Sequence, residues 1–445
     1  MIPDIFNIIN KARYSGIIAG PKTAPSLYQL SVKAFVKELD RKCKPETRIP
    51  ELQLLPAVAL ISILEEMSCY PSLRKKLHRE LCDPVVFMRM FMRFKADRLV
   101  LERCLRKASS IGKPVLPELA NNWCMMVNEK KSEASSSSIQ EAMEFGTYLH
   151  EAGWALQSID VFDIALRMIS QLKEDQHQEM VKLICTQKLL RAEGSAMLIS
   201  KADITCNTLL TMIEGIEDNE ILLTVFLEVA NHHFKAKRIA ETHNWTRKAM
   251  ELMTESTPAE HVIEILQLES IYLYLSQRYE SAGMIVNQAI HRARLTFGHL
   301  HRRYADTLYT YGVSLLKINA ISDSIPVFLE LLDIITKLYG TYTPHVAIIQ
   351  SYLAYGFYRR SQATGRFDMA YDHIQSAITL AKQIIPERQK VINHFCGIRA
   401  MILRGHEDVW EAVEENRAVR INNFYLFSIS EIKHLCFELH DEIDA

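Results

Sequence analysis

The chain has 445 residues, and its 52 basic side chains nearly balance 53 acidic ones, which leaves a formal net charge of −1. This balance disfavours binders of nucleic acid or of membrane surfaces, which need a basic excess to neutralise phosphates, so we expect no nucleic-acid partner. Apolar residues make up 48% and charged residues 24% of the chain, which excludes a disordered protein. Glycine (15) and proline (14) are scarce, which disfavours turn-rich β and Rossmann-type folds. The composition predicts an all-α protein.

The cysteine pattern indicates the cellular compartment. The nine cysteines are scattered and never form a C-x-x-C pair, which is typical of reduced thiols in a cytosolic or nuclear protein. The first residues lack the basic and apolar segments of a secretion signal, and no window approaches about 18 uncharged apolar residues. We expect no transmembrane segment and a cytoplasmic and nuclear location.

Taken in chain order, the composition divides the sequence into five parts. Residues 1–25 are interpreted as a loose leader, and residues 26–127 as a helical region with apolar periodicity. Residues 128–139 contain the tract KKSEASSSS, which predicts a solvated Ser-rich linker. Helical periodicity resumes over 140–410 as an array of repeats. Residues 411–445 are expected to form degenerate C-terminal helices.

The first predicted helix, SLYQLSVKAF from residue 26, carries an apolar stripe with a gap in its middle. Leu27, Ser31 and Phe35 recur at i, i+4 and i+8 and therefore share one helix face. The small Ser31 would let a partner approach between the two larger side chains. Downstream, Ile49 and Pro50 precede a second apolar helix. The plain alternative is an ordinary amphipathic helix whose apolar face belongs to the core.

The second half of the chain repeats itself. The small residues Ser270, Gly312 and Ala354 recur with a period of 42. Counted from each of these small residues, a second small residue follows near +12 and further side chains that pack between the helices follow near +16 and +19. In the last unit the first gap is longer. Five units fit: Gly146–Ser158–Phe162–Ala165, Ala230–Thr242–Thr246–Ala249, Ser270–Ala282–Val286–Ala289, Gly312–Ser324–Phe328–Leu331 and Ala354–Ala370–Ile374–Ala377. This pattern is typical of tetratricopeptide repeats, which stack helix pairs into a superhelix.

In such a superhelix, positions one, four and five residues after the small residue face the concave groove. The predicted groove residues, with Tyr309 one turn earlier, are Asn231, Phe234, Lys235, Tyr274, Tyr309, Lys317, Tyr355, Tyr358 and Arg359. Aromatic rings interleaved with cations suit an extended peptide, and Asn231 with Lys235 suits its terminal carboxylate. The alternative is that the cations are merely solvated and that neighbouring rings such as Tyr311 and Tyr352 pack between helices.

No catalytic motif is present. The sequence lacks G-x-S-x-G, H-E-x-x-H and the Gly-rich phosphate or dinucleotide loops. The densest imidazole groups, His232–His233 and His299 with His301, lack cysteines or paired carboxylates at ligand spacing. We therefore expect neither an enzyme, nor a cofactor, nor a metal site.

Several segments resemble a family of tetratricopeptide substrate receptors of cullin-2 RING ubiquitin ligases. They are SLYQLSVKAFVKEL (26–39), HEAGWALQSIDVF (150–162), TFGHLHRRYADTLYTYGVSLL (296–316), HVAIIQSYLAYGFY (345–358) and TGRFDMAYDHIQSAI (364–378), and the resemblance extends from residue 26 to about 405. It implies that Leu27, Ser31 and Phe35 form a box that binds elongin B/C, and that the Ile49–Pro50 element selects cullin-2.

The same resemblance implies further partners. The family is expected to recognise C-terminal degrons and is associated with the cytoplasmic tail of the amyloid precursor protein and with microtubules, which implies cytoskeletal or membrane association. The leading hypothesis is a non-catalytic substrate receptor of a ubiquitin ligase. The alternative is a transport adaptor that links membrane-protein tails to microtubules or kinesin, and only the receptor needs Leu27 exposed.

Overall fold

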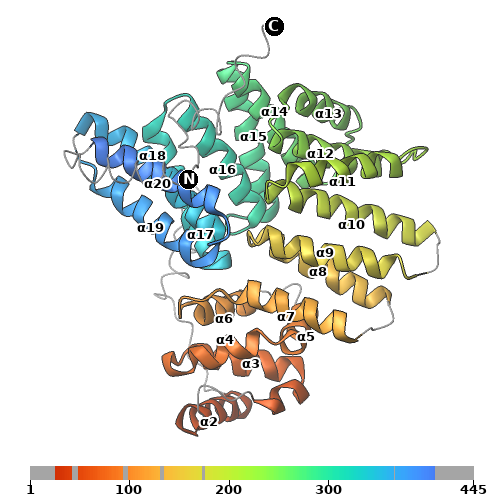
Figure 1. The fold of residues 1–445 in the computed structure, drawn as a ribbon, viewed down its shortest axis with the longest axis vertical. Helices are drawn as coiled ribbons and strands as arrows, with labels where there is room; N and C mark the ends of the chain where they lie inside the picture. Colours follow the sequence, from red (N-terminus) through yellow and green to blue (C-terminus); the bar gives the residue numbers. More distant parts are fainter. Residues whose placement is uncertain are drawn as a thin grey trace, which may run out of the picture.

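The computed structural model describes residues 26–42, 49–93, 99–130, 135–172, 176–364 and 366–405. Within these ranges the chain forms 19 α-helices, two short 3-10 helices and no strand, which confirms the all-α prediction (Figure 1). None of the helices described there combines the length and apolar character needed to cross a bilayer. The expected leader (1–25) and the expected degenerate helices (411–445) lie outside the described residues.

The N-terminal part is a small helical assembly at one end of the long axis (Figure 1). Its first helix turns one apolar face inward, because Val36 is fully buried and Val32 and Leu39 pack beside it. The elements are α2 (Leu27–Lys42), η1 (Pro50–Leu54), α3 (Ala57–Ser68), η2 (Pro71–Leu73), α4 (Arg74–Leu81), α5 (Pro84–Arg93), α6 (Leu99–Ser109) and α7 (Val115–Lys130).

The rest of the described chain is an array of antiparallel helix pairs followed by one more helix. The pairs are α8 (Ser136–Glu151) with α9 (Ala155–Ile169), α10 (Gln176–Ser195) with α11 (Ile199–Met212), α12 (Asn219–Lys235) with α13 (Ile239–Glu251), α14 (Ala259–Leu275) with α15 (Tyr279–Phe297), α16 (Arg302–Lys317) with α17 (Ile321–Tyr339), and α18 (Pro344–Thr364) with α19 (Asp368–Ile384); α20 (Gln389–Gly405) follows. The first helix of a pair also packs on the first helix of the next, as α12 does on α10 and α14.

The repeat phase read from the sequence is confirmed. All twenty residues of the five predicted units are buried. The reason is visible in the first unit, where Gly146 faces Phe162 so closely that a Cβ on Gly146 would lie 2.7 Å from the ring. The Ser158 hydroxyl donates to the Gly146 carbonyl over 2.7 Å. In this unit the ring of Phe162 therefore leaves space only for a glycine where the two helices cross.

The structure adds a pair that the sequence pattern missed. In α10 and α11 the corresponding positions are Leu190, Ala202, Cys206 and Leu209, and all four are buried. A leucine at the first position, where the other units carry glycine, alanine or serine, hid the unit. The repeat array is thus continuous from α8 to α19.

The predicted Ser-rich linker at 128–139 is wrong in its extent. The helix α7 continues to Lys130, and α8 begins at Ser136. The Ser135 hydroxyl accepts from the Ser138 backbone N–H, and the Ser138 hydroxyl accepts from the Ser135 N–H. Serine caps helix N-termini well because its oxygen pairs with an amide that lacks a partner in the helix, so this end of the tract starts a helix.

The array curls until its ends meet. The Arg302 guanidinium at the start of α16 donates to the Glu151 carbonyl at the end of α8 over 2.9 Å. The Arg388 guanidinium, just before α20, donates over 2.8 Å to the carbonyl of Ala196, just after α10. These contacts join residues 151 and 192 positions apart, so the superhelix is closed on itself.

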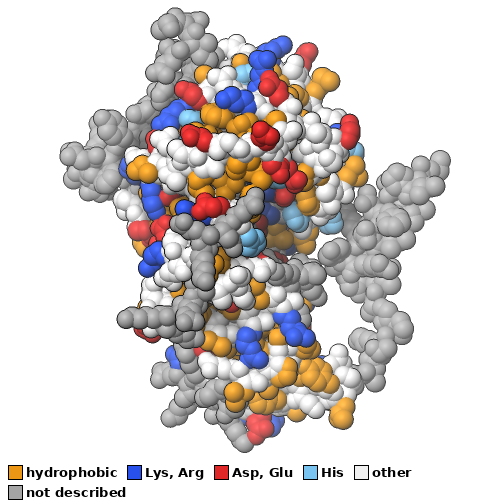
Figure 2. Space-filling view, turned by 90° about the vertical axis from the view of Figure 1, so that its right-hand side faces the viewer, with side chains coloured by type: hydrophobic (Ala, Val, Ile, Leu, Met, Phe, Trp, Pro, Cys, Tyr) orange, Lys and Arg blue, Asp and Glu red, His pale blue; other side chains and the backbone are white. Residues whose placement is uncertain are grey.

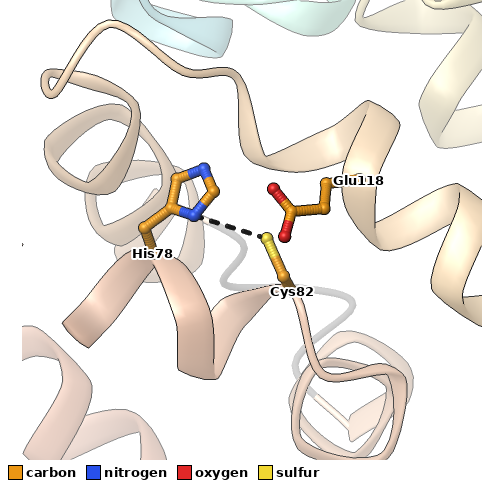
Figure 3. A group of neighbouring side chains, drawn as sticks. All are labelled: His78, Cys82 and Glu118. Carbon is orange, nitrogen blue, oxygen red and sulfur yellow. Dashed lines mark hydrogen bonds between the residues drawn. The ribbon is translucent and has the colours of Figure 1, made fainter. Parts of the chain in front are cut away.

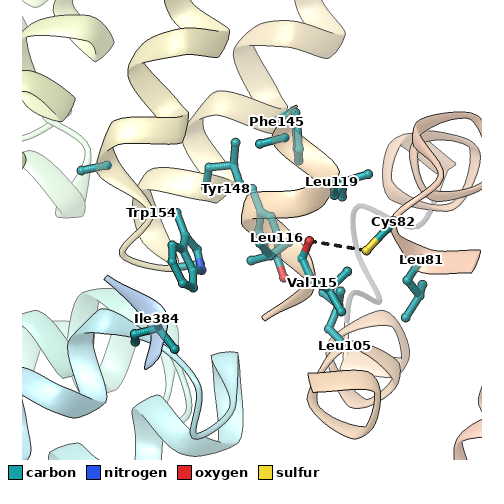
Figure 4. Close-up of a cluster of buried hydrophobic side chains, with 14 of the residues drawn as sticks. Leu81, Cys82, Leu105, Val115, Leu116, Leu119, Phe145, Tyr148, Trp154 and Ile384 are labelled. Atoms are coloured by element: carbon teal, nitrogen blue, oxygen red, sulfur yellow. Dashed lines mark hydrogen bonds between the residues drawn. The ribbon is translucent and has the colours of Figure 1, made fainter. Parts of the chain in front are cut away.

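One hydrophobic core unites the N-terminal helices with both ends of the array. It runs from Val36 to Ile402 and omits most of the middle repeats. Figure 4 shows part of it, with Leu105 of α6, Leu116 of α7 and Tyr148 of α8 gathered near Trp154, and Ile384 of α19 beyond. The helical region expected at 26–127 is therefore packed into the same core as the repeats.

Candidate functional site

The curled array forms an open cavity of about 200 Å³. The first helices of five successive pairs, α8, α10, α12, α14 and α16, supply most of its walls. Its polar lining is His150, Arg191, Ser195, Asn231, His232, Lys235, Glu264, Gln267, Arg302, Arg303, Asp306, Tyr309 and Thr310. We call this the central cavity. With four cationic side chains against two carboxylates, its lining favours anionic ligands.

Arg191 is held by two carboxylates from neighbouring helices. It lies 2.5 Å from Glu228 of α12 and 2.5 Å from Glu264 of α14, and its Nε also donates to Glu228 over 2.9 Å. Burial raises the pKa of both carboxyl groups; in Glu264, Arg191 and Arg303 outweigh it and lower the pKa to about 2, whereas the pKa of Glu228 stays raised. Arg191 is therefore paired with carboxylates inside the protein, and these contacts tie α10, α12 and α14 together.

Arg302 and Arg303 extend the network onto α16. Arg302 pairs with Asp306 at 2.8 Å, and Arg303 lies 3.4 Å from Glu260 and 3.6 Å from Glu264. Each of these arginines therefore has an acidic partner within the protein.

Lys235 differs from the arginines around it. It is solvent-exposed at the end of α12, and among the described residues no carboxylate forms an ion pair with it. The cavity walls desolvate its ammonium group and lower its pKa, although Asp306 acts in the opposite direction. Its ammonium lies 5.9 Å from the centre of the Phe234 ring. Lys235 is thus the cavity cation best placed to meet a ligand anion.

A second cavity, of about 830 Å³, opens between α8 and α10. Its apolar lining includes Ile139, Met143, Val181 and Ile184. Glu151 and Lys188 line this second cavity. On the same two helices, α8 and α10, they are close in sequence to His150 and Arg191 of the central cavity. The two cavities therefore combine an apolar and a cationic surface on one side of the array.

The structure brings four predicted groove residues together in the central cavity: Asn231, Phe234, Lys235 and Tyr309. Asn231 already donates from its amide to Glu264, so only its remaining N–H can serve a ligand. The Tyr309 hydroxyl lies 3.1 Å from that of Tyr352, and the two rings meet edge to face. Their roles in peptide binding stay predictions.

The other five predicted groove residues do not line the central cavity. Tyr274 and Tyr358 are only 4% and 8% exposed, because Tyr274 packs against the start of α15 and Tyr358 against Phe367, with ring centres 6.1 Å apart. Placing these two rings in an open groove was wrong. Tyr355 is partly buried against the hydrophobic core, Lys317 is half-buried, and Arg359 donates to the Asn319 side chain over 2.9 Å.

The predicted docking stripe on α2 is exposed. Leu27 is 81% exposed and Phe35 39%, and Ser31 lies between them with its hydroxyl bonded to the Leu27 carbonyl at 2.9 Å. The face that α2 buries consists of other residues, Val32 and Val36 among them, so the alternative of a core-facing stripe is wrong. Figure 2 shows hydrophobic side chains gathered on the lower part of the molecule, where the N-terminal helices lie.

The predicted Ile49–Pro50 element, unlike the exposed stripe of α2, has its isoleucine in the core. Ile49 is only 6% exposed, and its N–H donates to the Glu80 carboxylate over 3.0 Å. It serves the core of the N-terminal helices, so the Ile49 side chain is not a docking surface. Pro50 begins η1, where its missing N–H costs nothing.

Several cavity residues escaped the sequence analysis. Arg191 lies one residue after Leu190, just as Asn231 lies one residue after Ala230. His150 lies four residues after Gly146. Applying the groove rule to every unit, the missed one included, would have found both. Glu264 and Asp306 share a position six residues before the small residue, which the rule did not cover.

Fold and cavity define a class of protein: an α-solenoid of tetratricopeptide type whose repeats surround a cationic cavity. No protein-family model matches the chain. Among solved structures, a Rap protein complexed with competence and sporulation factor superposes with a TM-score of 0.50 and 12% identity, over 67% of this chain and 80% of that one. This likeness concerns the fold alone.

Among curated proteins, the chain is similar to amyloid protein-binding protein 2 of rat (Rattus norvegicus) and of mouse (Mus musculus). Identity is 26% over 340 residues in both cases, which covers 74% of this chain and 57% of each relative. The chain is thus a distant relative of that protein and spans little more than half its length.

Proposed function

We propose that the chain is a non-catalytic protein-binding scaffold that serves as a substrate-recognition subunit of a cullin-2 RING ubiquitin ligase. In this proposal α2 docks on elongin B/C, and the central cavity receives the C-terminal tail of a substrate. The chain contributes no reacting group; it raises the local concentration of the bound substrate near the ligase.

The exposed stripe of α2 carries this proposal. Two large apolar side chains, Leu27 and Phe35, lie in solvent while the same helix buries a separate apolar face. Exposing them is unfavourable unless a partner covers them, since burying one leucine contributes roughly 1.5–3 kcal/mol. Leu27, Ser31 and Phe35 also occupy the positions that the family resemblance assigns to elongin binding.

The central cavity supports the second half of the proposal. A peptide C-terminus carries a carboxylate that Lys235 can bind by a charge-assisted hydrogen bond. The apolar cavity between α8 and α10 offers space for the preceding side chains. The curated relatives are named for binding an amyloid protein, which agrees with a protein ligand.

The docking test is co-purification of the intact chain with elongin B/C and cullin-2. Combined Leu27→Ala and Ser31→Arg should abolish recovery of the elongins without changing helicity. The matched control is Leu295→Ala, which removes an equally isolated leucine, 73% exposed, from α15. Undiminished elongin recovery with the double variant would contradict the ligase role.

The cavity test is a fluorescence titration with a library of peptides that carry free or amidated C-termini. Peptides that bind should prefer the free carboxylate, and Lys235→Glu should remove this preference. Lys382→Glu, on the exposed surface of α19, should leave it intact. Equal affinity for free and amidated peptides would exclude the carboxylate role of Lys235.

The transport adaptor is the second candidate, favoured by the name of the curated relatives, which refers to binding an amyloid protein. An adaptor would bind membrane-protein tails and microtubules or kinesin but would have no use for elongins. If the intact chain binds such tails but does not co-purify with elongin B/C, the result would favour the adaptor over the ligase subunit.

A further inference from the structure

Three side chains of the N-terminal helices form a cluster that the proposed function does not use. His78 and Cys82 are spaced i,i+4 at the end of α4, and the helical bond from the Cys82 N–H to the His78 carbonyl, 3.0 Å long, keeps both on one face. Glu118 comes from the first turn of α7. Figure 3 shows its carboxylate pointing toward both of them.

The spacing of the donor atoms fits a zinc ion. The His78 Nδ1 and the Cys82 Sγ are 3.6 Å apart, and one carboxylate oxygen of Glu118 lies within 4.8 Å of each. Zinc–nitrogen and zinc–sulfur bonds of about 2.0 and 2.3 Å at a tetrahedral angle place the two ligand atoms about 3.5 Å apart. The His78–Cys82 pair already has that separation, and a small rotation of the exposed Glu118 side chain brings its oxygen into range.

The kinds of donor point to the same ion. A thiolate, an imidazole and a carboxylate together suit zinc, whereas calcium and magnesium prefer oxygen ligands throughout. The charges also balance, because one thiolate and one carboxylate neutralise a divalent cation at a place where His78 and Cys82 are both buried.

Binding changes the protonation of the ligands. A metal ligand must be deprotonated at the atom that binds, so zinc would displace the thiol proton of Cys82. Binding therefore releases one proton to solvent and changes no oxidation state.

We propose that His78, Cys82 and Glu118 bind one Zn²⁺, with a water molecule as the fourth ligand. The ion would tie α4 to α7 and so brace the N-terminal helices that carry the exposed stripe of α2. The sequence predicts no metal site at its densest imidazole groups, and His78 is not one of them. The third ligand, Glu118, also comes from a helix 36 residues further along the chain than Cys82.

The test uses the full chain, stripped of metal with a chelator and titrated with Co²⁺ as a spectroscopic probe. A thiolate–cobalt charge-transfer band should appear at one equivalent and disappear on adding Zn²⁺. Cys82→Ser should abolish the band, and Glu118→Gln, a change at an exposed side chain that leaves the core intact, should weaken affinity at least ~10-fold. Zn²⁺ should also raise the melting temperature of the parent chain but not of Cys82→Ser.

Cys69→Ser is the matched control, because Cys69 is an exposed thiol outside the cluster; it should leave the band unchanged. A band that survives Cys82→Ser, or a parent chain that shows no thiolate–cobalt band, overturns the proposal. In the second case the thiol–imidazole hydrogen bond alone accounts for the short distance.

Discussion

At the scale of single residues, the crossing in two of the helix pairs depends on a glycine that faces a phenylalanine ring. Gly312 of α16 repeats what Gly146 does in α8: a Cβ at Gly312 would lie 2.9 Å from the tip of the Phe328 ring. Phe328 in turn stacks on Tyr352 of the next pair, with ring centres 5.2 Å apart. A side chain at Gly312 therefore has no space without moving the neighbouring repeat.

Gly312→Leu should lower the free energy of unfolding by about 1–3 kcal/mol through overpacking. The measurement is denaturant unfolding followed by circular dichroism. Gly283→Ala is the control, because a Cβ at Gly283 in α15 meets no atom within 4 Å; it should stabilise the helix by about 0.5–1 kcal/mol. A Gly312→Leu chain as stable as its parent would refute the repeat phase.

His150 provides a pH prediction at the same scale. Burial, together with the positive charges of Arg191, Arg302 and Lys235, lowers its pKa to about 3. Since the folded pKa lies below the unfolded value of about 6.5, the unfolded chain takes up the proton first as the pH falls. The stability that neutral His150 provides is complete above pH about 6.5 and is lost progressively toward pH 3.

His150→Gln removes this titration and keeps a polar end for Ser195, whose hydroxyl lies 3.0 Å from the histidine Nε2. When the pH falls from 7 to 5, the free energy of unfolding should drop in the parent by up to about 2 kcal/mol more than in the variant. Urea unfolding at the two pH values measures the difference. Equal losses in both chains would show that His150 titrates normally.

At the scale of elements, the turn inside five helix pairs has one shared conformation. The residue two positions before the second helix has a positive φ in each of these turns, at Gly153, Met197, Lys237, Gln277 and Asn319. In each turn the next N–H donates back to the carbonyl five residues earlier, as from Leu198 to Glu193 at 3.0 Å. Glycine suits this left-handed conformation, whereas methionine, lysine and glutamine are strained in it.

Met197→Gly should therefore raise the free energy of unfolding by about 0.5–1 kcal/mol. Its φ is 58°, and its side chain is half exposed, so little burial is lost. Thermal and denaturant melts provide the measurement. The reverse change at the equivalent position, Gly153→Ala, should destabilise; opposite signs from those expected would mean that the turns are not under strain.

At the scale of the whole molecule, closure of the array determines what the chain can present. The Arg388–Ala196 and Arg302–Glu151 bonds hold the two ends together and leave the central cavity between them. In the same region Gly153 packs on His345, at the start of α18, within 3 Å of the position of an added Cβ. The cavity is thus a product of contacts between distant repeats.

Arg388→Ala should lower the free energy of unfolding by about 1–3 kcal/mol, because a charged donor is lost from a partly buried carbonyl. Hydrogen exchange should accelerate both in α20 and around Ala196, although the two segments are far apart in sequence. Arg404→Ala, at an exposed arginine near the end of α20, should accelerate neither. Faster exchange confined to α20 would mean that the closure does not stabilise α10.

The sequence by itself determined the local architecture. Helix pairs of fixed phase follow from small residues at fixed spacing, because each pair is formed by contacts within about 20 residues, as between Gly146 and Phe162. The same local logic predicted that Asn231, Phe234 and Lys235 share one face of α12. It failed at Leu190, where a leucine at the small position concealed a repeat.

Only the tertiary structure decided which of these faces stay open. Tyr274 and Tyr358 satisfy the groove rule but are covered by neighbouring helices, and Ile49 is buried through its bond to Glu80. Arg191 and Lys235 carry the same charge, yet Arg191 forms ion pairs with Glu228 and Glu264 and is less available to a ligand than Lys235. Such outcomes depend on contacts between elements dozens to hundreds of residues apart, which a periodic pattern does not encode because it records the face of a helix and not what packs against it.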